Sequence, residues 1–345
     1  MNSLENLILA YLENNPARSS KDVFDGLNAT KGYATVKRCL TQLIEKRYVS
    51  KVGIGKGTKY ALSHSYAIIK PIDIDAYFNQ DIDERIIQSS YNFNLIHGIL
   101  PSVELFSQDE MNKLQLLQKQ FEAKTNVLST HQYAKELERL AIDLSWKSSQ
   151  IEGNTYSLLE TECLLKDKRT AAGKTQQEAT MLLNHKAAID FIIDQPDYLI
   201  PMKVSAIEDI HGILVKDLGI NRNIRNHRVG VIGTNYVPLD NDHQIKDAMA
   251  QMCNLVNSKH SVFEKALLLL VLLSYIQAFD DGNKRTARIV SNACLIHYQH
   301  CPLSFRTIDP IEYKKAMLLF YEQNNISAFK NLFIGQFEFA VNTYF

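Results

Sequence analysis

Apolar residues recur every three or four positions along most of this chain, which is the spacing of an amphipathic helix. In the first part the pattern predicts helices over about 2–14, 21–27 and 33–47. Further on it predicts helices over about 108–124, 130–151, 156–165, 176–193 and 203–217, and then from 242 to the end, except for a turn near 280 and a loop at 301–309. The chain is therefore predicted to be mainly α-helical.

Two segments break the helical pattern. Residues 48–62 place a glycine-rich tip between two short runs of β-branched and aromatic residues, which predicts a β-hairpin. Residues 225–238 repeat the signal, with Gly233 in a turn between Val231 and Tyr236. An isolated hairpin buries little of itself. We therefore expect the second one to be a packed flap, or a surface that docks an extended partner segment by edge pairing.

Three helices followed by a hairpin within residues 1–64 resemble a small winged helix-turn-helix domain. Between Thr30 and Tyr60 the chain carries eight lysines and arginines against one acid. A basic third helix and hairpin tip would meet the phosphates of DNA, and a protein that reads paired half-sites would act as a homodimer. The alternative is a partner-binding module whose charges are merely solvated. The residues predicted to contact DNA are Lys31, Lys37, Arg38, Lys56 and Lys59.

Composition sets broad limits on the rest of the chain. Its 345 residues predict two or three units, which we place at 1–64, 65–105 (a connector) and 106–345. Lys+Arg and Asp+Glu are balanced at 38 each, so an argument for nucleic acid must be local. The five scattered cysteines lack metal-ligand spacing, the N-terminus lacks signal-peptide features, and no apolar run reaches the ~20 residues of a membrane span. We therefore expect a cytoplasmic protein without a membrane partner.

The densest chemistry lies in residues 277–288, QAFDDGNKRTAR, between two apolar runs. This pattern predicts a buried helix, a short polar turn and the start of a second helix. Backbone N–H groups at a helix N-terminus form an anion site, and Arg285 and Arg288 share one face of that helix. Asp281 lies where a divalent cation could bridge its carboxylate and a phosphate. The local chemistry predicts a polyphosphate with magnesium.

A second candidate feature ends the predicted helix over 130–151, where the chain reads SSQIEGN from Ser148 to Asn154. Gly153 suits the left-handed position that terminates a helix. Glu152 lies in the last turn, where its negative charge is unfavourable against the helix dipole and calls for a cationic partner. Taken alone, this residue also fits an exposed glutamate in water.

These features together resemble one known family. Residues 277–288 are similar to the Fic-domain signature, H-x-F-x-(D/E)-G-N-G-R-x-x-R, in ten of twelve positions. Ser148, Glu152 and Gly153 resemble the inhibitory motif (S/T)-x-x-x-E-(G/N) of Fic proteins that carry their inhibitor in cis. The segment 225–238 falls where that family keeps its target-docking flap. The resemblance covers about residues 106–340.

The resemblance implies a Fic-type helical core with a β-hairpin flap. It also implies an activity, the transfer of AMP from ATP to a Ser, Thr or Tyr hydroxyl of a protein substrate. The region of residues 130–153 would then be an inhibitory helix, with Glu152 paired to Arg288 so that the γ-phosphate is misplaced. The flap residues would be Arg225, Val231, Gly233 and Tyr236.

By the same resemblance, Asp281 would bind Mg²⁺ across the α- and β-phosphates. Asn283 and the amides near Gly282 would hold the α-phosphate, as an oxyanion hole does. Lys284 would belong to the nucleotide site, and the two arginines, Arg285 and Arg288, would take the β- and γ-phosphates.

Two positions depart from the family pattern. Gln277 replaces the histidine that serves the family as general base, and a carboxamide cannot accept a proton near neutral pH. Lys284 replaces a glycine and resembles the Doc toxins, which transfer phosphate, although Doc-type motifs carry alanine where this chain keeps Gly282. The favoured hypothesis is an adenylyltransferase inhibited by Glu152. The alternatives are a weakly active, ATP-binding regulator that binds DNA, a Doc-like phosphotransferase, an enzyme that removes AMP, and a scaffold without activity.

Overall fold

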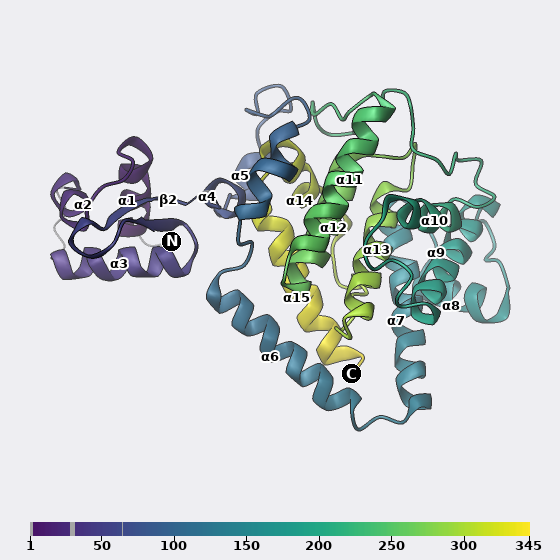
Figure 1. Ribbon diagram of the computed structural model, residues 1–345. Coiled ribbons are helices and arrows are strands. Elements are labelled where there is room, and N and C mark those ends of the chain that lie inside the picture. Colours follow the sequence, from purple (N-terminus) through teal and green to yellow (C-terminus); the bar gives the residue numbers. More distant parts are fainter. Residues whose placement is uncertain (1–2, 28–31, 64) are drawn as a thin grey trace. The chain divides into compact units, whose positions relative to one another are not determined.

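The computed structural model describes residues 3–27, 32–63 and 65–345 (Figure 1). The chain divides into two compact units, one made of residues 1–71 with 102–113, the other of residues 72–101 with 114–345. Helices dominate, as the apolar pattern predicts, and the sheet found in the described ranges is a two-stranded antiparallel hairpin. No helix in these ranges is long and apolar enough to cross a membrane.

The first unit builds a small core from three helices and the hairpin. The apolar faces of the helices meet at buried residues such as Leu12, Val36 and Leu40, and the hairpin closes over them. Each predicted helix end lies within two residues of the observed one, and the winged-helix class itself stays a prediction. The elements are α1 (Ser3–Asn14), α2 (Ser20–Gly26), α3 (Tyr33–Glu45), β1 (Val49–Val52), the turn η1 (Gly55–Gly57), β2 (Lys59–Leu62) and the short α4 (Tyr66–Ile69).

The second unit is a helical bundle centred on α12 (Val262–Ile276), in which every residue from Phe263 onward is buried. A helix that is apolar on all sides requires neighbours on all sides. Here α11, α14 and α15 pack against α12, and α13 returns along it and also contacts α7, α9 and α10 (Figure 1). The other bounds are α7 (Thr130–Ile151), α8 (Leu158–Asp167), α9 (Gln176–Asp194), α10 (Val204–Leu214), α11 (Asp242–Ser258), α13 (Asn283–His297), α14 (Pro310–Gln323) and α15 (Ser327–Thr343).

Residues 65–105, expected as a connector, form only short helical pieces. These are α4, α5 (Ile74–Phe78), a π-helical turn η2 (Leu95–Ile99) and a 3₁₀ turn η3 (Leu100–Ser102). The long helix α6 (Gln108–Thr125) follows and begins with a capping box, in which Ser107 and Glu110 bond to each other's backbone N–H groups. Residues 114–125 of α6 belong to the second unit.

The polar turn between α12 and α13 has a fixed backbone. Gln277 ends α12 in the left-handed region with φ 52°, and Gly282 caps α13 with φ 80°. A Cβ at Gly282 would lie 3.4 Å from Val215 and 3.5 Å from His211, so both conformation and space favour glycine. The ring of His211 stacks on Phe279 at 3.7 Å, and its Nε2 lies 3.0 Å from the carbonyl oxygen of Asp281. This histidine therefore holds the turn in place through its contacts with Phe279 and the Asp281 carbonyl.

The β-hairpin predicted over residues 225–238 is wrong, because this segment contains no strand paired within itself. Its backbone bonds to other parts of the chain instead. The N–H of Arg225 donates to the carbonyl of Ala278 at 3.0 Å, and the N–H of Val237 donates to Ser89 at 2.8 Å. The segment is thus an extended loop held at both ends, and we call residues 225–238 the flap segment.

Candidate active site

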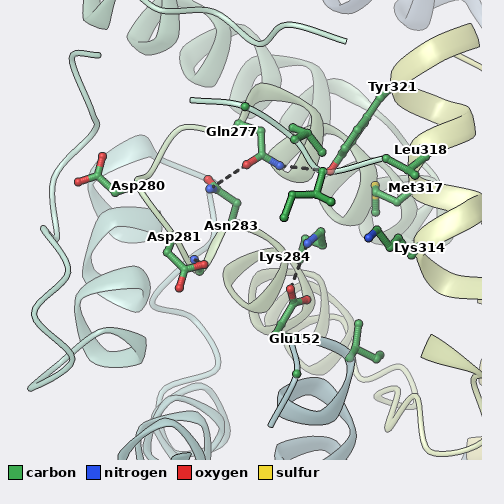
Figure 2. Close-up of a pocket in the computed structure, with 16 residues that line it drawn as sticks. Glu152, Gln277, Asp280, Asp281, Asn283, Lys284, Lys314, Met317, Leu318 and Tyr321 are labelled. Atoms are coloured by element: carbon green, nitrogen blue, oxygen red, sulfur yellow. Dashed lines mark hydrogen bonds and ion pairs between the residues drawn. The ribbon is translucent and has the colours of Figure 1, made fainter. Parts of the chain in front are cut away.

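A cleft of about 490 Å³ opens at the point where α7 ends, beside the turn between α12 and α13 (Figure 2). Four parts of the second unit contribute to its wall: the end of α7, the flap segment, the 277–288 motif and one face of α14. Segments more than 100 residues apart in sequence therefore meet at one cavity. The lining residues are Ile151, Glu152, Gly153, Gly230, Val231, Ile232, Gln277, Asp280, Asp281, Gly282, Asn283, Lys284, Lys314, Met317, Leu318 and Tyr321.

Glu152 is the charged centre of this cleft. Its Oε1 accepts a hydrogen bond from Arg288 Nη2 at 2.8 Å. Its Oε2 accepts one from Lys284 Nζ at 3.0 Å, and Figure 2 shows this second contact. Burial by itself raises the pKa of Glu152, but the charges of Arg288 and Lys284 outweigh it and lower the pKa to about 2. The carboxylate is therefore ionised throughout the physiological range. Gly153 follows with φ 97°, the left-handed conformation that ends the helix.

Arg288 is fully buried and is held by α7 on several sides. Its Nε donates to Ser148 Oγ at 2.7 Å and its Nη2 donates to the Ser148 carbonyl at 3.0 Å. Its guanidinium carbon lies 5.1 Å from the ring centre of Tyr313. Arg288 does not line the cleft, whereas Glu152 does. Glu152 thus covers this arginine from the side of the cavity.

A buried histidine completes the contact behind Arg288. Nε2 of His185 lies 2.6 Å from Ser148 Oγ. Burial, reinforced by the positive charges of Arg288 and Arg285, holds the pKa of His185 well below its ordinary value. The ring is therefore neutral, and Ser148 Oγ joins it to Arg288, since the same oxygen bonds to His185 Nε2 and accepts from Arg288 Nε. The chain of contacts fixes the orientation of Ser148.

Arg285 lies beneath the turn and is 1% exposed. Its Nη2 pairs with Asp281 Oδ2 at 3.1 Å, while Nε and Nη1 are buried without a hydrogen-bond partner among the described residues. Unpartnered guanidinium donors are costly, and an anion approaching the start of α13 would satisfy them. Arg285, like Arg288, is absent from the cleft wall.

Asp281 is the residue best placed to hold a metal ion, since its side chain is 64% exposed at the cleft. Within the described residues no cluster of three or more His, Cys, Asp or Glu side chains could hold an ion alone. A single carboxylate fits Mg²⁺, which commonly takes one or two protein carboxylates and completes its shell with phosphate oxygens and water. The site therefore fits magnesium that arrives with a nucleotide, through Asp281.

Gln277 is locked by its neighbours. Its Nε2 donates to the Ser274 carbonyl at 2.7 Å and lies 3.3 Å from Tyr321 Oη, and its Oε1 accepts from Asn283 Nδ2 at 3.2 Å. Asn283 also bonds through both side-chain polar atoms to the backbone of Phe279, at 2.8 and 2.9 Å. The Asn283 side chain, predicted to hold the α-phosphate, is thus committed to the turn, and the helix amides remain for that role.

The four predicted flap residues occupy different places. Val231 lines the cleft, whereas Arg225 and Tyr236 are buried anchors at 2% exposure. Nε of Arg225 donates to the Gln277 carbonyl at 2.6 Å, and Tyr236 Oη donates to the Tyr275 carbonyl at 3.1 Å. The carbonyl of Gly233 accepts from Arg85 Nη2 at 3.1 Å. Only the middle of the flap segment therefore faces the cavity.

The predicted DNA-contacting residues lie in the first unit. Lys37 and Arg38 are exposed on α3, with Lys37 Nζ 5.7 Å from the ring centre of Tyr33, and Lys59 is exposed on β2. Lys31 lies outside the described residues, as does the side chain of Lys56. Two other basic residues of the region are paired, Lys46 with Glu5 and Arg47 with Glu104.

Several site residues were missed by sequence reasoning. The sequence pattern places Lys284 in the site but does not predict its ion pair with Glu152, and it gives no signal for His185. The α14 residues Lys314, Met317, Leu318 and Tyr321 follow helical spacing, which also describes an ordinary packed face. No sequence signal distinguished them from core.

Comparison with known proteins finds matches to one family. The family model described as the Fic/DOC family matches residues 201–295, which include the flap segment and the 277–288 motif. A curated relative, "Protein adenylyltransferase Fic" of Aedes aegypti, is 25% identical over 203 residues, or 56% of this chain and 40% of that protein. The chain thus spans well under half the length of this relative.

Solved structures share the fold. Fic-1 from C. elegans superposes with a TM-score of 0.61 at 17% identity, covering 68% of this chain and 72% of that one. A Fic-domain-containing signalling protein from Bacteroides thetaiotaomicron superposes with a TM-score of 0.58 at 19% identity, covering 67% and 95% respectively. At these identities the likeness concerns the fold.

Proposed function

This chain is a Fic family protein, and from that premise we propose that it is a protein adenylyltransferase held inactive by Glu152. The enzyme would move AMP from ATP to a hydroxyl group of a protein substrate. The observation that carries this proposal is the position of Glu152, whose two oxygens bind Arg288 and Lys284 at 2.8 and 3.0 Å. A carboxylate there pairs with Arg288 and Lys284, the side chains that would otherwise bind the phosphates of a polyphosphate.

The start of α13 supplies the anion site in this proposal. The first N–H groups of a helix have no intrahelical acceptor, and the cap residue Gly282 and the first residues of α13, Asn283 and Lys284, line the cleft. Arg285 would add hydrogen bonds from its unpartnered Nε and Nη1 atoms. Asp281 would hold Mg²⁺, which when bound neutralises phosphate charge. These groups position and stabilise the nucleotide without accepting a proton.

The reaction would be limited by proton removal. The substrate hydroxyl oxygen forms a bond to the α-phosphorus, the bond to pyrophosphate breaks, and the hydroxyl proton must leave. Gln277 can orient the hydroxyl but cannot take its proton, so the proton passes to solvent. Loss of a general base typically slows a reaction by about 10²–10⁴-fold. We therefore expect slow transfer even after inhibition is removed.

Two substitutions test this proposal in sequence. Glu152→Gly should raise self-labelling by ATP carrying its label on the α-phosphate. Adding Gln277→His should raise labelling by a further factor of about 10²–10⁴. The matched control is γ-labelled ATP, which should leave no label. Intact ATP binding without incorporation in either variant would refute AMP transfer, and γ-label alone would favour the Doc-like phosphotransfer that Lys284 suggests.

A second candidate function rests on α3. Its exposed face carries Lys37 and Arg38, and it is flanked by exposed Lys59 on β2, which together suit a helix facing a phosphate backbone. We infer that the first unit binds DNA. A gel shift of Lys37→Ala/Arg38→Ala should show weaker binding and a shallower salt dependence than the parent. Lys119→Ala, an exposed lysine of the second unit, is the control, and equal shifts for both variants would count against DNA binding.

A further inference from the structure

Glu152 is shared between two cations of different character. Arg288 is fully buried and contacts Ser148 and Tyr313 in addition to Glu152. The Lys284 side chain is 30% exposed, and Glu152 is its single hydrogen-bond or ion-pair partner among the described residues. Arg288 is therefore fixed by the fold, whereas Lys284 is held by one carboxylate.

We propose that Lys284 is an exchangeable cation: it fastens Glu152 in the resting protein and transfers to a nucleotide phosphate when Glu152 leaves. This inference rests on the proposed function, since it concerns the regulation of the same cleft. A lysine carries a compact charge on a flexible stem, so it can follow a new anion without rearrangement of the helix that bears it. Lys284 and Glu152 both line the cavity, and Figure 2 shows their side chains pointing toward each other.

Charge balance in the cleft supports the exchange. With Glu152 in place, four cations (Lys284, Arg285, Arg288 and Lys314) lie in or behind the cleft wall with three carboxylates (Glu152, Asp280 and Asp281). Departure of Glu152 leaves two carboxylates against four cations, two of which are buried arginines. An uncompensated buried charge is strongly unfavourable, so the open cleft requires an anion. A polyphosphate supplies several negative charges at the place that Glu152 vacates.

The exchange predicts that the two residues are coupled in ATP binding. In the parent, ATP gains a contact to Lys284 but first breaks the contact of Lys284 with Glu152, so the net contribution of Lys284 is small. Without the Glu152 charge, the same contact is gained at no loss. A lysine that only bound phosphate would instead contribute equally to ATP affinity with and without the Glu152 charge, because independent effects add.

The test is a double-mutant cycle on the full chain. ATP with Mg²⁺ is titrated by calorimetry into the parent, Lys284→Met, Glu152→Gln and the double variant. Lys284→Met should weaken ATP binding by about tenfold or more in the Glu152→Gln background, and by less than about threefold in the parent. Equal factors in the two backgrounds would overturn the exchange.

Controls separate a lost contact from a damaged fold. Lys314→Met removes another lysine of the cleft wall, one without a carboxylate partner among the described residues, and should have the same factor in both backgrounds. Lys284→Arg should retain most of the affinity, because it keeps the charge. Adenosine, which has no phosphate, should bind alike with and without Lys284, and an equal loss for adenosine would contradict a role at phosphate.

A second measurement needs no nucleotide. Lys284→Met should lower the unfolding temperature of the parent but leave that of Glu152→Gln unchanged, because its partner charge is already absent. If no variant binds ATP, the proposed function fails together with the exchange. If ATP binds and the effects are additive, the proposed function stands and only the exchange fails.

Discussion

Glu152→Gln is the substitution whose effect the structure fixes most closely, since it keeps the shape of the side chain and removes its charge. Glutamate has an ordinary pKa of 4.5, and here Arg288 and Lys284 lower it to about 2 against the opposing effect of burial. At about 1.36 kcal/mol per pH unit, that difference corresponds to about 3 kcal/mol in the free energy of unfolding. We expect the glutamine variant to be less stable than the parent by about that amount at pH 7.

The pH dependence has a definite sign. A carboxylate with a depressed pKa stabilises the folded state fully above its unfolded pKa, here about 4.5, and the contribution disappears as pH falls toward about 2. The parent should therefore lose about 3 kcal/mol more than Glu152→Gln over this window. A saturating amount of ATP with Mg²⁺ should raise the stability of the variant more than that of the parent, because it supplies the missing anion.

Urea unfolding provides the assay, followed by the fluorescence of Trp146, the single tryptophan of the chain. Trp146 lies on α7 with its indole N–H donating to the Tyr156 carbonyl at 3.0 Å, so it reports on the helix that carries Glu152. Glu162→Gln is the matched control. Glu162 pairs with Lys166 on the exposed face of α8, and its loss should cost below about 0.5 kcal/mol. Similar losses for the two glutamine variants would refute the reasoning.

Three further predictions follow from other contacts. Arg85→Met should destabilise the protein by about 3–5 kcal/mol, because Glu322 is then buried without its partner, and adding Glu322→Met should recover much of the loss in urea unfolding. His185 is buried neutral, so the free energy of unfolding should fall as pH drops below about 6.5, by up to about 1.4 kcal/mol per pH unit, and His185→Gln should flatten that slope. Reversing charge with Lys37→Glu/Arg38→Glu should abolish DNA retardation while leaving the far-ultraviolet circular dichroism spectrum unchanged, and a changed spectrum would point to misfolding instead.

The positions of the helices could be predicted from the sequence because a helix is a local structure. Its hydrogen bonds join residues four apart, and its buried face repeats along the chain. The predicted helix over 130–151 coincides with α7, and the predicted helix over about 108–124 agrees with α6 to within one residue at each end. The family resemblance carried by residues 277–288 is confirmed by the Fic/DOC family model, which matches residues 201–295. The inhibitory motif at Glu152 lies outside that match and stays a prediction.

The flap segment shows where local reasoning fails. Its β-branched residues and Gly233 favour an extended chain with a turn, and that part of the interpretation holds. A hairpin also requires the two arms to choose each other as hydrogen-bond partners. Here Val237 pairs with Ser89 and Arg225 pairs with Ala278, both distant in sequence, and these contacts satisfy the backbone instead.

Sequence alone identified the candidate site residues. These are an acid at a helix end (Glu152), two arginines (Arg285 and Arg288), an aspartate (Asp281) and a glutamine in place of a base (Gln277). Tertiary structure decided how they are paired. Glu152 meets Lys284 across 132 positions of the chain and Arg288 across 136, and His185 reaches Ser148 across 37. Such pairings depend on the packing of α7 and α9 against α13, which itself lies along the buried α12, and no local pattern encodes this arrangement. The contact of Glu152 with Arg288 and Lys284 is therefore a property of the bundle, although each of these residues can be identified in the sequence.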